Sequence, residues 1–120
     1  MIRCSAAIAD GHGGFQIEEI EVHEPGNDEV VVKIKAAGIC HTDYDSLSWN
    51  KPLIIGHEGA GIVEQVGKDV TNVSKGDKVI LNWATPCGLC FQCMEGNQNI
   101  CEINSPVVAG KNGYSAGHAD

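Results

Sequence analysis

Residues 29–37 read Glu-Val-Val-Val-Lys-Ile-Lys-Ala-Ala, and they form the clearest β-strand pattern in the chain. The apolar side chains of Val30, Val32 and Ile34 alternate with lysines, so that they share one face of an extended backbone. This alternation is typical of a strand with one face toward a core and the other toward solvent.

Other stretches of similar character surround this strand at short intervals: residues 3–9, 15–22, 59–67 and 78–82. Turn-forming residues separate them, at 25–28 and 75–77. Only residues 42–47 favour a helical turn. The sequence therefore predicts a mainly β fold, a small barrel or sandwich. Its predicted core includes these residues: Val30, Val32, Ile34, Val63, Val66, Val79 and Leu81.

Length and charge limit the possible functions. The chain has 120 residues, enough for one domain or part of a larger one, and its net charge is −8. That charge repels phosphates, so no nucleic-acid or membrane partner is expected. No run of about 18 apolar residues occurs, and the first residues lack the apolar stretch of a secretory signal. We therefore expect a cytoplasmic protein.

Residues 83–106 form a lobe in which glycine, cysteine, asparagine and proline dominate. Its cysteines follow the spacing Cys-x2-Cys-x2-Cys-x7-Cys: Cys87, Cys90, Cys93 and Cys101. Four thiolates match the tetrahedral preference of zinc and leave no open position, so the pattern predicts a structural zinc site. We expect Phe91 and Ile100 to support the loop as buried apolar side chains.

Two other interpretations of these cysteines remain open. Disulfides would be typical of a secreted chain, where bridges are usually spread along the sequence. An iron–sulfur cluster would favour a last gap of three residues followed by proline, whereas here the gap is seven and Glu102 follows.

A second group of metal-binding side chains lies at predicted strand ends. Residues 38–43 read Gly-Ile-Cys-His-Thr-Asp, and residues 56–61 read Gly-His-Glu-Gly-Ala-Gly. Cys40 and His57, with nearby carboxylates, could form a metal site with an open position. Taken alone, a residue such as Cys40 is more often a small buried side chain, and one such as His57 is more often an ordinary core histidine.

These two segments and the cysteine lobe occur in the order found in one family. Together they resemble the zinc-dependent medium-chain alcohol dehydrogenases, in the N-terminal part of their GroES-like catalytic domain, across residues 1–120. The resemblance implies an enzyme with structural and catalytic zinc and with NAD or NADP. It would oxidise primary, possibly aromatic, alcohols to aldehydes through a zinc alkoxide and hydride transfer. It also implies a homo-oligomer.

The resemblance also assigns roles to residues. Cys40, His57 and a cysteine further along would hold the catalytic zinc, with Glu58 beside the metal. Asp43 would hydrogen-bond His57, and Thr42 would take the alcohol proton.

The remaining assignments concern the cofactor and the pocket. His41 would contact the cofactor pyrophosphate, while Leu47, Trp49 and Trp83 would line the substrate pocket. A relay histidine of some members is replaced by Asp45, and the segment between the two zinc ligands is shorter than in animal enzymes.

No strand–GxGxxG–helix unit occurs in the sequence, so a nucleotide-binding domain is absent from these residues. The chain is therefore expected to be an inactive fragment of a dehydrogenase. A stand-alone, zinc-stabilised binding module without catalysis is the alternative.

Overall fold

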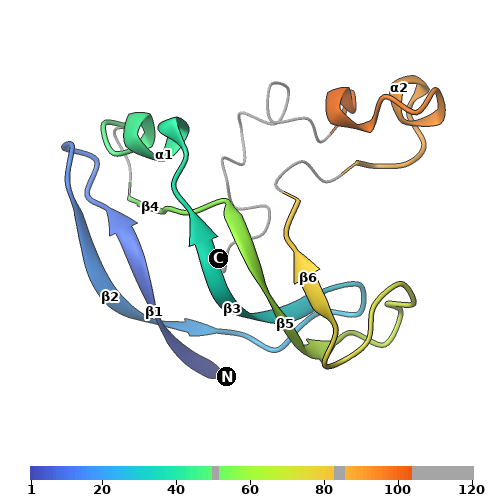
Figure 1. Ribbon diagram of the computed structural model, residues 1–120, viewed down its shortest axis with the longest axis horizontal. Coiled ribbons are helices and arrows are strands. Elements are labelled where there is room, and N and C mark those ends of the chain that lie inside the picture. Colours follow the sequence, from blue (N-terminus) through green and yellow to red (C-terminus); the bar gives the residue numbers. More distant parts are fainter. Residues whose placement is uncertain (50–51, 83–85, 104–120) are drawn as a thin grey trace.

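The computed structural model describes residues 1–49, 52–82 and 86–103 (Figure 1). Its elements follow in this order: β1 (Ile2–Ala9), β2 (Phe15–Val22), β3 (Val30–Gly38), α1 (His41–Ser46), β4 (Leu53–Ile54), β5 (Glu58–Val66), β6 (Lys78–Ile80), α2 (Phe91–Met94) and the 3₁₀ turn η1 (Gln98–Ile100). The predicted mainly β fold is confirmed. The helical turn begins and ends one residue earlier than expected, and the short strand β4 was not predicted.

The strands form two antiparallel sheets of three strands each, in the orders β2-β1-β4 and β3-β5-β6. Strands β1 and β2 form a hairpin that pairs along its whole length, from Ile2 opposite Val22 to Ala9 opposite Phe15. Figure 1 shows α1 and α2 at the same end of the molecule, above the strands. The chain segments predicted to carry chemistry therefore gather at one end.

The central strand β5 approaches β3 so closely that glycine is needed at position 61. A Cβ atom added to Gly61 would collide with the backbone carbonyl oxygen of Lys33. Gly61 pairs with Ile34 on one side and with Val79 on the other, so it lies in the middle of the sheet. A backbone collision cannot be relieved by turning a side chain, and the two strands would have to separate.

Part of the predicted core is wrong. Val63 is buried as expected, but Val30 and Ile34 are 37% and 48% exposed. Strand β3 lies at the edge of its sheet, and two register shifts, at Val31/Val32 and Ile34/Ala36, break its regular alternation. The other predicted core residues are half-buried: Val32, Val66, Val79 and Leu81.

The first sheet contributes a core residue that the pattern did not single out. Ala9 is completely buried at the end of β1, between Phe15 of β2 and Leu53 of β4. Among the described residues, no helix has the length and apolar character needed to cross a membrane. The cytoplasmic location stays a prediction.

Candidate metal centre and catalytic site

The pairing of β3 with β5 brings the two predicted zinc ligands together. Gly38, the last residue of β3, pairs with Glu58, the first residue of β5. Cys40 follows β3 by two residues and His57 immediately precedes β5, so both lie at the same end of the antiparallel pair. The donor atoms of Cys40, His57 and Glu58 all lie within 4.8 Å of one another.

This donor set fits a zinc ion. Thiolate, imidazole and carboxylate are the ligand types that zinc takes in proteins. His57 is buried, Cys40 is half-buried and Glu58 is exposed, so the group opens toward solvent on the glutamate side. Glycine at position 38 gives Glu58 its room, because a Cβ atom there would collide with the Glu58 carboxylate.

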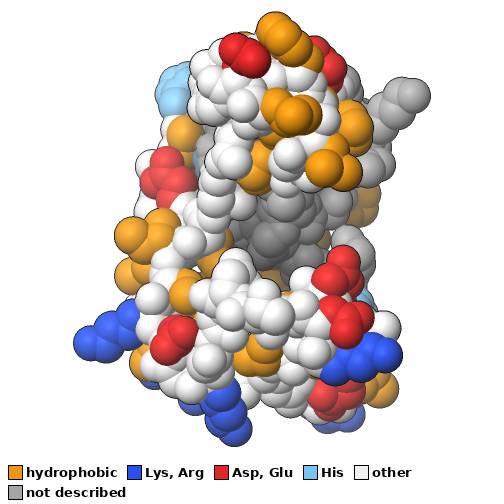
Figure 2. Space-filling view, turned by 90° about the vertical axis from the view of Figure 1, so that its right-hand side faces the viewer, with side chains coloured by type: hydrophobic (Ala, Val, Ile, Leu, Met, Phe, Trp, Pro, Cys, Tyr) orange, Lys and Arg blue, Asp and Glu red, His pale blue; other side chains and the backbone are white. Residues whose placement is uncertain are grey.

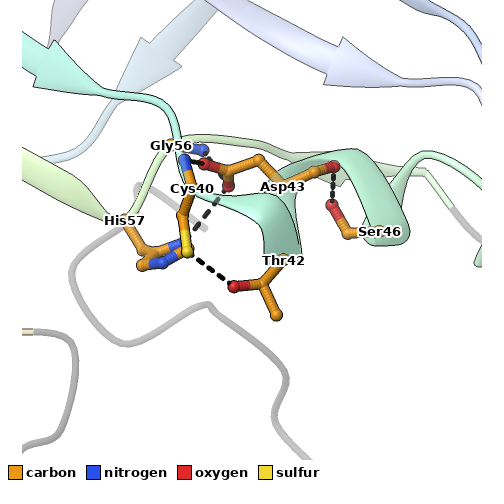
Figure 3. A network of polar contacts seen from close by, with 6 residues as sticks. All are labelled: Cys40, Thr42, Asp43, Ser46, Gly56 and His57. Atoms are coloured by element: carbon orange, nitrogen blue, oxygen red, sulfur yellow. Dashed lines mark hydrogen bonds and ion pairs between the residues drawn. The ribbon is translucent and has the colours of Figure 1, made fainter.

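Asp43 connects both halves of this site (Figure 3). Its Oδ1 atom lies 3.1 Å from Nδ1 of His57 and accepts a hydrogen bond of 3.2 Å from the backbone N–H of Gly56. Its Oδ2 atom accepts a 3.0 Å hydrogen bond from the backbone N–H of Cys40. Asp43 and His57 are each 8% exposed. Because an ionised carboxylate only accepts, Nδ1 of a neutral His57 would donate to Asp43, and Nε2 would be the ring nitrogen for a metal.

Helix α1 holds Thr42 beside the ligand sulfur. The Oγ1 atom of Thr42 lies 2.9 Å from Sγ of Cys40, and Figure 3 shows the hydroxyl directed at that sulfur. The buried Ser46 donates a 2.7 Å hydrogen bond from Oγ to the backbone carbonyl of Asp43. The sequence reading missed Ser46, although the Asp-x-x-Ser spacing places its hydroxyl one helical turn after Asp43.

The predicted cofactor and pocket residues are less closely grouped. His41 is exposed, and its Nε2 atom lies 3.6 Å from Oδ1 of Asp45. Its ring centroid is 5.9 Å from that of Tyr44. Leu47 and Trp49 are half-buried directly after α1.

One predicted pocket residue, Trp83, lies outside the described residues, so only Leu47 and Trp49 can be placed. Both follow the helix that carries Thr42 and Asp43.

The cysteine lobe brings its four sulfur atoms to one point. The ligand atoms of Cys87, Cys90, Cys93 and Cys101 lie within 4.8 Å of one another, and none of the four is in a disulfide. Two of the sulfur pairs, Cys87 with Cys93 and Cys90 with Cys101, are each 4.0 Å apart. Tetrahedral zinc with bonds of about 2.3 Å requires sulfur separations of about 3.8 Å. The four side chains therefore fit a zinc ion and are not arranged as disulfides.

Backbone amides point at sulfur atoms of the lobe. The N–H groups of Leu89 and Cys90 point at Sγ of Cys87, at 3.4 and 3.3 Å, and the N–H of Cys93 points at Sγ of Cys90 at 3.4 Å. The hydrogen bond from the Cys93 backbone lowers the pKa of Cys90.

Cys93 shows the opposite effect. Burial among the other sulfurs raises the pKa of the Cys93 thiol to about 12. A bound cation would reverse this effect, because it compensates for the lost solvation of the thiolate. A bound metal would therefore favour the ionised form of the buried Cys93 sulfur.

The predicted apolar support of the lobe is wrong, since Phe91 and Ile100 are 65% and 50% exposed. Figure 2 shows hydrophobic side chains gathered over the lobe at one end of the molecule, and the blue lysine and arginine side chains of that face at the other end. The exposed apolar residues of the lobe are Leu89, Phe91, Met94, Ile100 and Ile103. With so few buried apolar groups among the described residues 86–103, we expect the lobe to depend on its cysteines for its fold.

Comparison with known proteins identifies the family. The sequence-family model described as the alcohol dehydrogenase GroES-like domain matches residues 26–119. The chain belongs to the zinc-dependent medium-chain alcohol dehydrogenase family. The resemblance stated from the motifs is thereby confirmed, as is the GroES-like fold with its four-cysteine lobe.

Individual relatives agree with this assignment. An alcohol dehydrogenase of Schizosaccharomyces pombe is 46% identical over 106 residues, covering 80% of this chain and 30% of the relative. The crystal structure of benzyl alcohol dehydrogenase from Acinetobacter calcoaceticus matches with a TM-score of 0.80 and 36% identity, over 87% of this chain and 30% of that one.

A third comparison concerns metal. A cobalt- and zinc-bound thermostable alcohol dehydrogenase from Pyrobaculum aerophilum matches with a TM-score of 0.77 and 34% identity, over 87% of this chain and 33% of that one. The chain thus spans about a third of the length of the relatives it matches.

Proposed function

We propose that the whole protein to which this chain belongs is an NAD(P)-dependent zinc alcohol dehydrogenase that oxidises primary alcohols to aldehydes. One observation carries the proposal: the donor atoms of Cys40, His57 and Glu58 lie together, with His57 oriented by the buried Asp43. Family membership supports it, because the site uses the segments by which the family was recognised.

In this proposal Cys40 and His57 hold zinc at a site with an open position, and Glu58 lies beside the metal. Bound zinc supplies Lewis-acid chemistry that lowers the pKa of an alcohol, and the nicotinamide supplies the hydride acceptor. Asp43 keeps the Nε2 lone pair of His57 directed at the ion, and its bond to the Cys40 backbone fixes the second ligand.

Thr42 is the proposed acceptor of the alcohol proton. Its hydroxyl lies 2.9 Å from the Sγ atom of Cys40, and it would be the group that accepts the proton of an alcohol held at this site. Oγ1 accepts the alcohol proton while the hydroxyl passes its own proton toward water. Asp45 stands in the place of a relay histidine, with its Oδ1 atom 3.6 Å from Nε2 of His41, so the last transfer would go to solvent or through this pair.

The cysteine lobe has a separate role. Four thiolates fill the coordination shell of an ion, so Cys87, Cys90, Cys93 and Cys101 would hold a zinc that stabilises the fold and binds no substrate.

For the substrate we propose aromatic or medium-length primary alcohols. Leu47 and Trp49 directly follow helix α1 and are half-buried, and in this proposal they form an apolar wall of the substrate pocket. Among the structural neighbours, one with a TM-score of 0.80 is a benzyl alcohol dehydrogenase. His41, exposed at the start of α1, would contact the cofactor pyrophosphate.

The test is a steady-state assay of the whole protein with NAD and with NADP. Benzyl alcohol should be oxidised with a higher kcat/KM than ethanol, and Cys40→Ser should abolish turnover of both while leaving the lobe zinc in place. A clear preference for ethanol would reject the aromatic substrate. Zinc-loaded whole protein without turnover of any alcohol would reject the dehydrogenase.

The second candidate is a zinc-stabilised binding module without catalysis. The apolar surface of the lobe favours it, because Leu89 and Met94 are 83% and 75% exposed. The same assay distinguishes the two candidates, since a binding module would not reduce the nicotinamide cofactor when alcohol is added. The homo-oligomeric state of the whole protein stays a prediction.

A further inference from the structure

The turn between β1 and β2 is built around one carboxylate. Oδ1 of Asp10 accepts hydrogen bonds from the backbone N–H groups of His12, at 2.7 Å, and Gly14, at 3.1 Å. The N–H of Asp10 in turn donates to the carbonyl of Gly14 at 3.0 Å. Gly11 and Gly13 have φ values of 79° and 90°, which the turn requires and which glycine adopts without strain.

This turn is bonded to the segment between the two metal ligands. The N–H of Gly13 donates a 2.8 Å hydrogen bond to the carbonyl of Leu47, the residue that follows α1. At the other end of the segment, β4 pairs with β1, and the N–H of Ile55 donates a 3.0 Å hydrogen bond to the carbonyl of Ala7. The β1–β2 hairpin therefore holds both ends of the chain that joins Cys40 to His57.

The two attachments differ in what they fix. Strand pairing through β4 fixes Ile55 and the approach to His57 by means of regular sheet hydrogen bonds. The segment after α1 has a single described backbone bond to the hairpin, from Gly13 to Leu47. The backbone N–H groups of Leu47, Ser48 and Trp49 donate to carbonyls three residues back, at 3.1–3.3 Å. The position of Leu47 thus depends on the shape of the 10–14 turn.

We propose that Asp10 is a positioning residue for substrate specificity: by holding the 10–14 turn it fixes the Leu47 carbonyl, and with it the Leu47–Trp49 wall of the alcohol pocket. The role in substrate specificity rests on the proposed function, whereas the positioning of Leu47 rests on hydrogen-bond geometry alone. The hydrogen bonds that the structure describes for Asp10 lie within the 10–14 turn, so its effect would reach the pocket wall through the bond from Gly13 to Leu47.

The turn has no other side chain that could replace Asp10. The remaining turn residues are glycines and His12, and both N–H groups in question point at the same carboxylate oxygen. Those two hydrogen bonds also lower the pKa of Asp10, which is consistent with a carboxylate that stays ionised while it organises the turn. Gly14 is fitted to it as well, because a Cβ atom there would lie 2.8 Å from Oδ2 of Asp10.

The first arm of the test is amide hydrogen exchange on the zinc-loaded chain. In Asp10→Ala the amides of Gly13, Leu47, Ser48 and Trp49 should exchange about fivefold faster, the effect of losing one ordinary hydrogen bond. The amide of Ile55 should keep its exchange rate, because β4 still pairs with β1. Asp10→Asn should restore slow exchange, since its amide oxygen can accept both backbone bonds.

A matched control removes a similar carboxylate elsewhere. Oδ2 of Asp77 accepts a 2.9 Å hydrogen bond from the N–H of Ser74 in the turn before β6. Asp77→Ala should therefore loosen that turn and leave Leu47–Trp49 unchanged. If Asp10→Ala fails to fold, Gly14→Ala serves instead: it displaces the Asp10 carboxylate and should speed exchange at Leu47–Trp49 in the same direction.

The second arm is kinetic and uses the whole protein. Asp10→Ala should raise KM for benzyl alcohol several-fold more than KM for ethanol, with kcat nearly unchanged, because the wall moves while ligands and proton acceptor stay. A general loss of stability would instead lower the activity on both alcohols alike. Unchanged exchange at Leu47–Trp49, or an unchanged KM ratio in an active enzyme, overturns the inference. An unaltered whole protein that turns over no alcohol overturns the proposed function and the specificity role, whereas the exchange result remains a separate measurement of the positioning.

Discussion

Oδ1 of Asp43 lies 3.1 Å from Nδ1 of His57, and the same carboxylate group accepts the backbone N–H groups of Cys40 and Gly56. One buried side chain thus sets the orientation of one predicted zinc ligand and the backbone position of the other. The buried Asp43 therefore fixes the inner side of the site, whereas the side of the exposed Glu58 is open to solvent.

Asp43→Asn should weaken zinc binding at the Cys40–His57 site by about 10- to 100-fold. Asparagine has one acceptor oxygen where the carboxylate uses two, and its amide N–H₂ would face a donor. The affinity is measured by competition with a chelator on the whole protein. Asp45→Asn, on the exposed face of the same helix, is the control and should bind zinc normally. Equal affinity in Asp43→Asn and the unaltered protein would contradict this role.

Removing one lobe cysteine should unfold the lobe. In Cys93→Ser the ion loses a buried thiolate ligand, and structural zinc sites contribute about 10–16 kcal/mol of apparent binding energy to folding in small domains. We expect loss of one zinc per chain and rapid proteolysis within residues 86–103. Cys4→Ser, at an exposed cysteine of β1, should change neither zinc content nor proteolysis. Iron in the elemental analysis would show that the zinc assignment is wrong.

The 120-residue chain by itself should bind close to one zinc ion and show no dehydrogenase activity. The lobe supplies four thiolates, whereas the second site has one thiolate, one imidazole and an exposed carboxylate among the described residues. Fewer thiolates give weaker retention during dialysis. The check is elemental analysis combined with an assay containing nicotinamide cofactor and alcohol. Two firmly held zinc ions, or measurable turnover, would contradict the expectation.

Gly61→Ala should destabilise the β3–β5–β6 sheet by about 1–3 kcal/mol, because the new methyl group meets the backbone carbonyl of Lys33. Thermal unfolding followed by circular dichroism measures the loss. Gly59→Ala is the matched control in the same strand: its Cβ would meet the ends of the Leu81 and Ile34 side chains, at 3.0 and 3.3 Å, which can move. A melting temperature equally lowered in both variants would argue against the backbone collision.

Local patterns predicted the strands well because alternation and turn residues are written in adjacent positions. Residues 15–22 form β2 with the predicted bounds, and β3, β5 and β6 begin within one residue of expectation. The cysteine spacing likewise predicted a cluster that the structure brings together. Both features depend on residues close in sequence.

Features that depend on distant neighbours were not predictable in this way. The exposure of Ile34 follows from the register shifts of β3 and its place at a sheet edge, neither of which its own sequence reveals. Strand β4 has only two residues, and it exists because β1 offers it a hydrogen-bonding edge. The hydrogen bond from Gly13 to Leu47 joins residues 34 positions apart, and neither local sequence pattern predicts it.

The antiparallel pairing that sets Gly38 opposite Glu58 fixes the metal ligands independently of the segment that joins them. The spacing of Cys40 and His57 is set by the ladder between β3 and β5, and it does not depend on the length of the segment that joins them. That segment can therefore gain or lose residues after Ser46 at the modest entropic cost of a longer or shorter loop, while the coordination geometry is inherited unchanged. Under the proposed function, enzymes built on this plan would change the alcohols they accept by exchanging this one segment, which is therefore where a new specificity would be engineered.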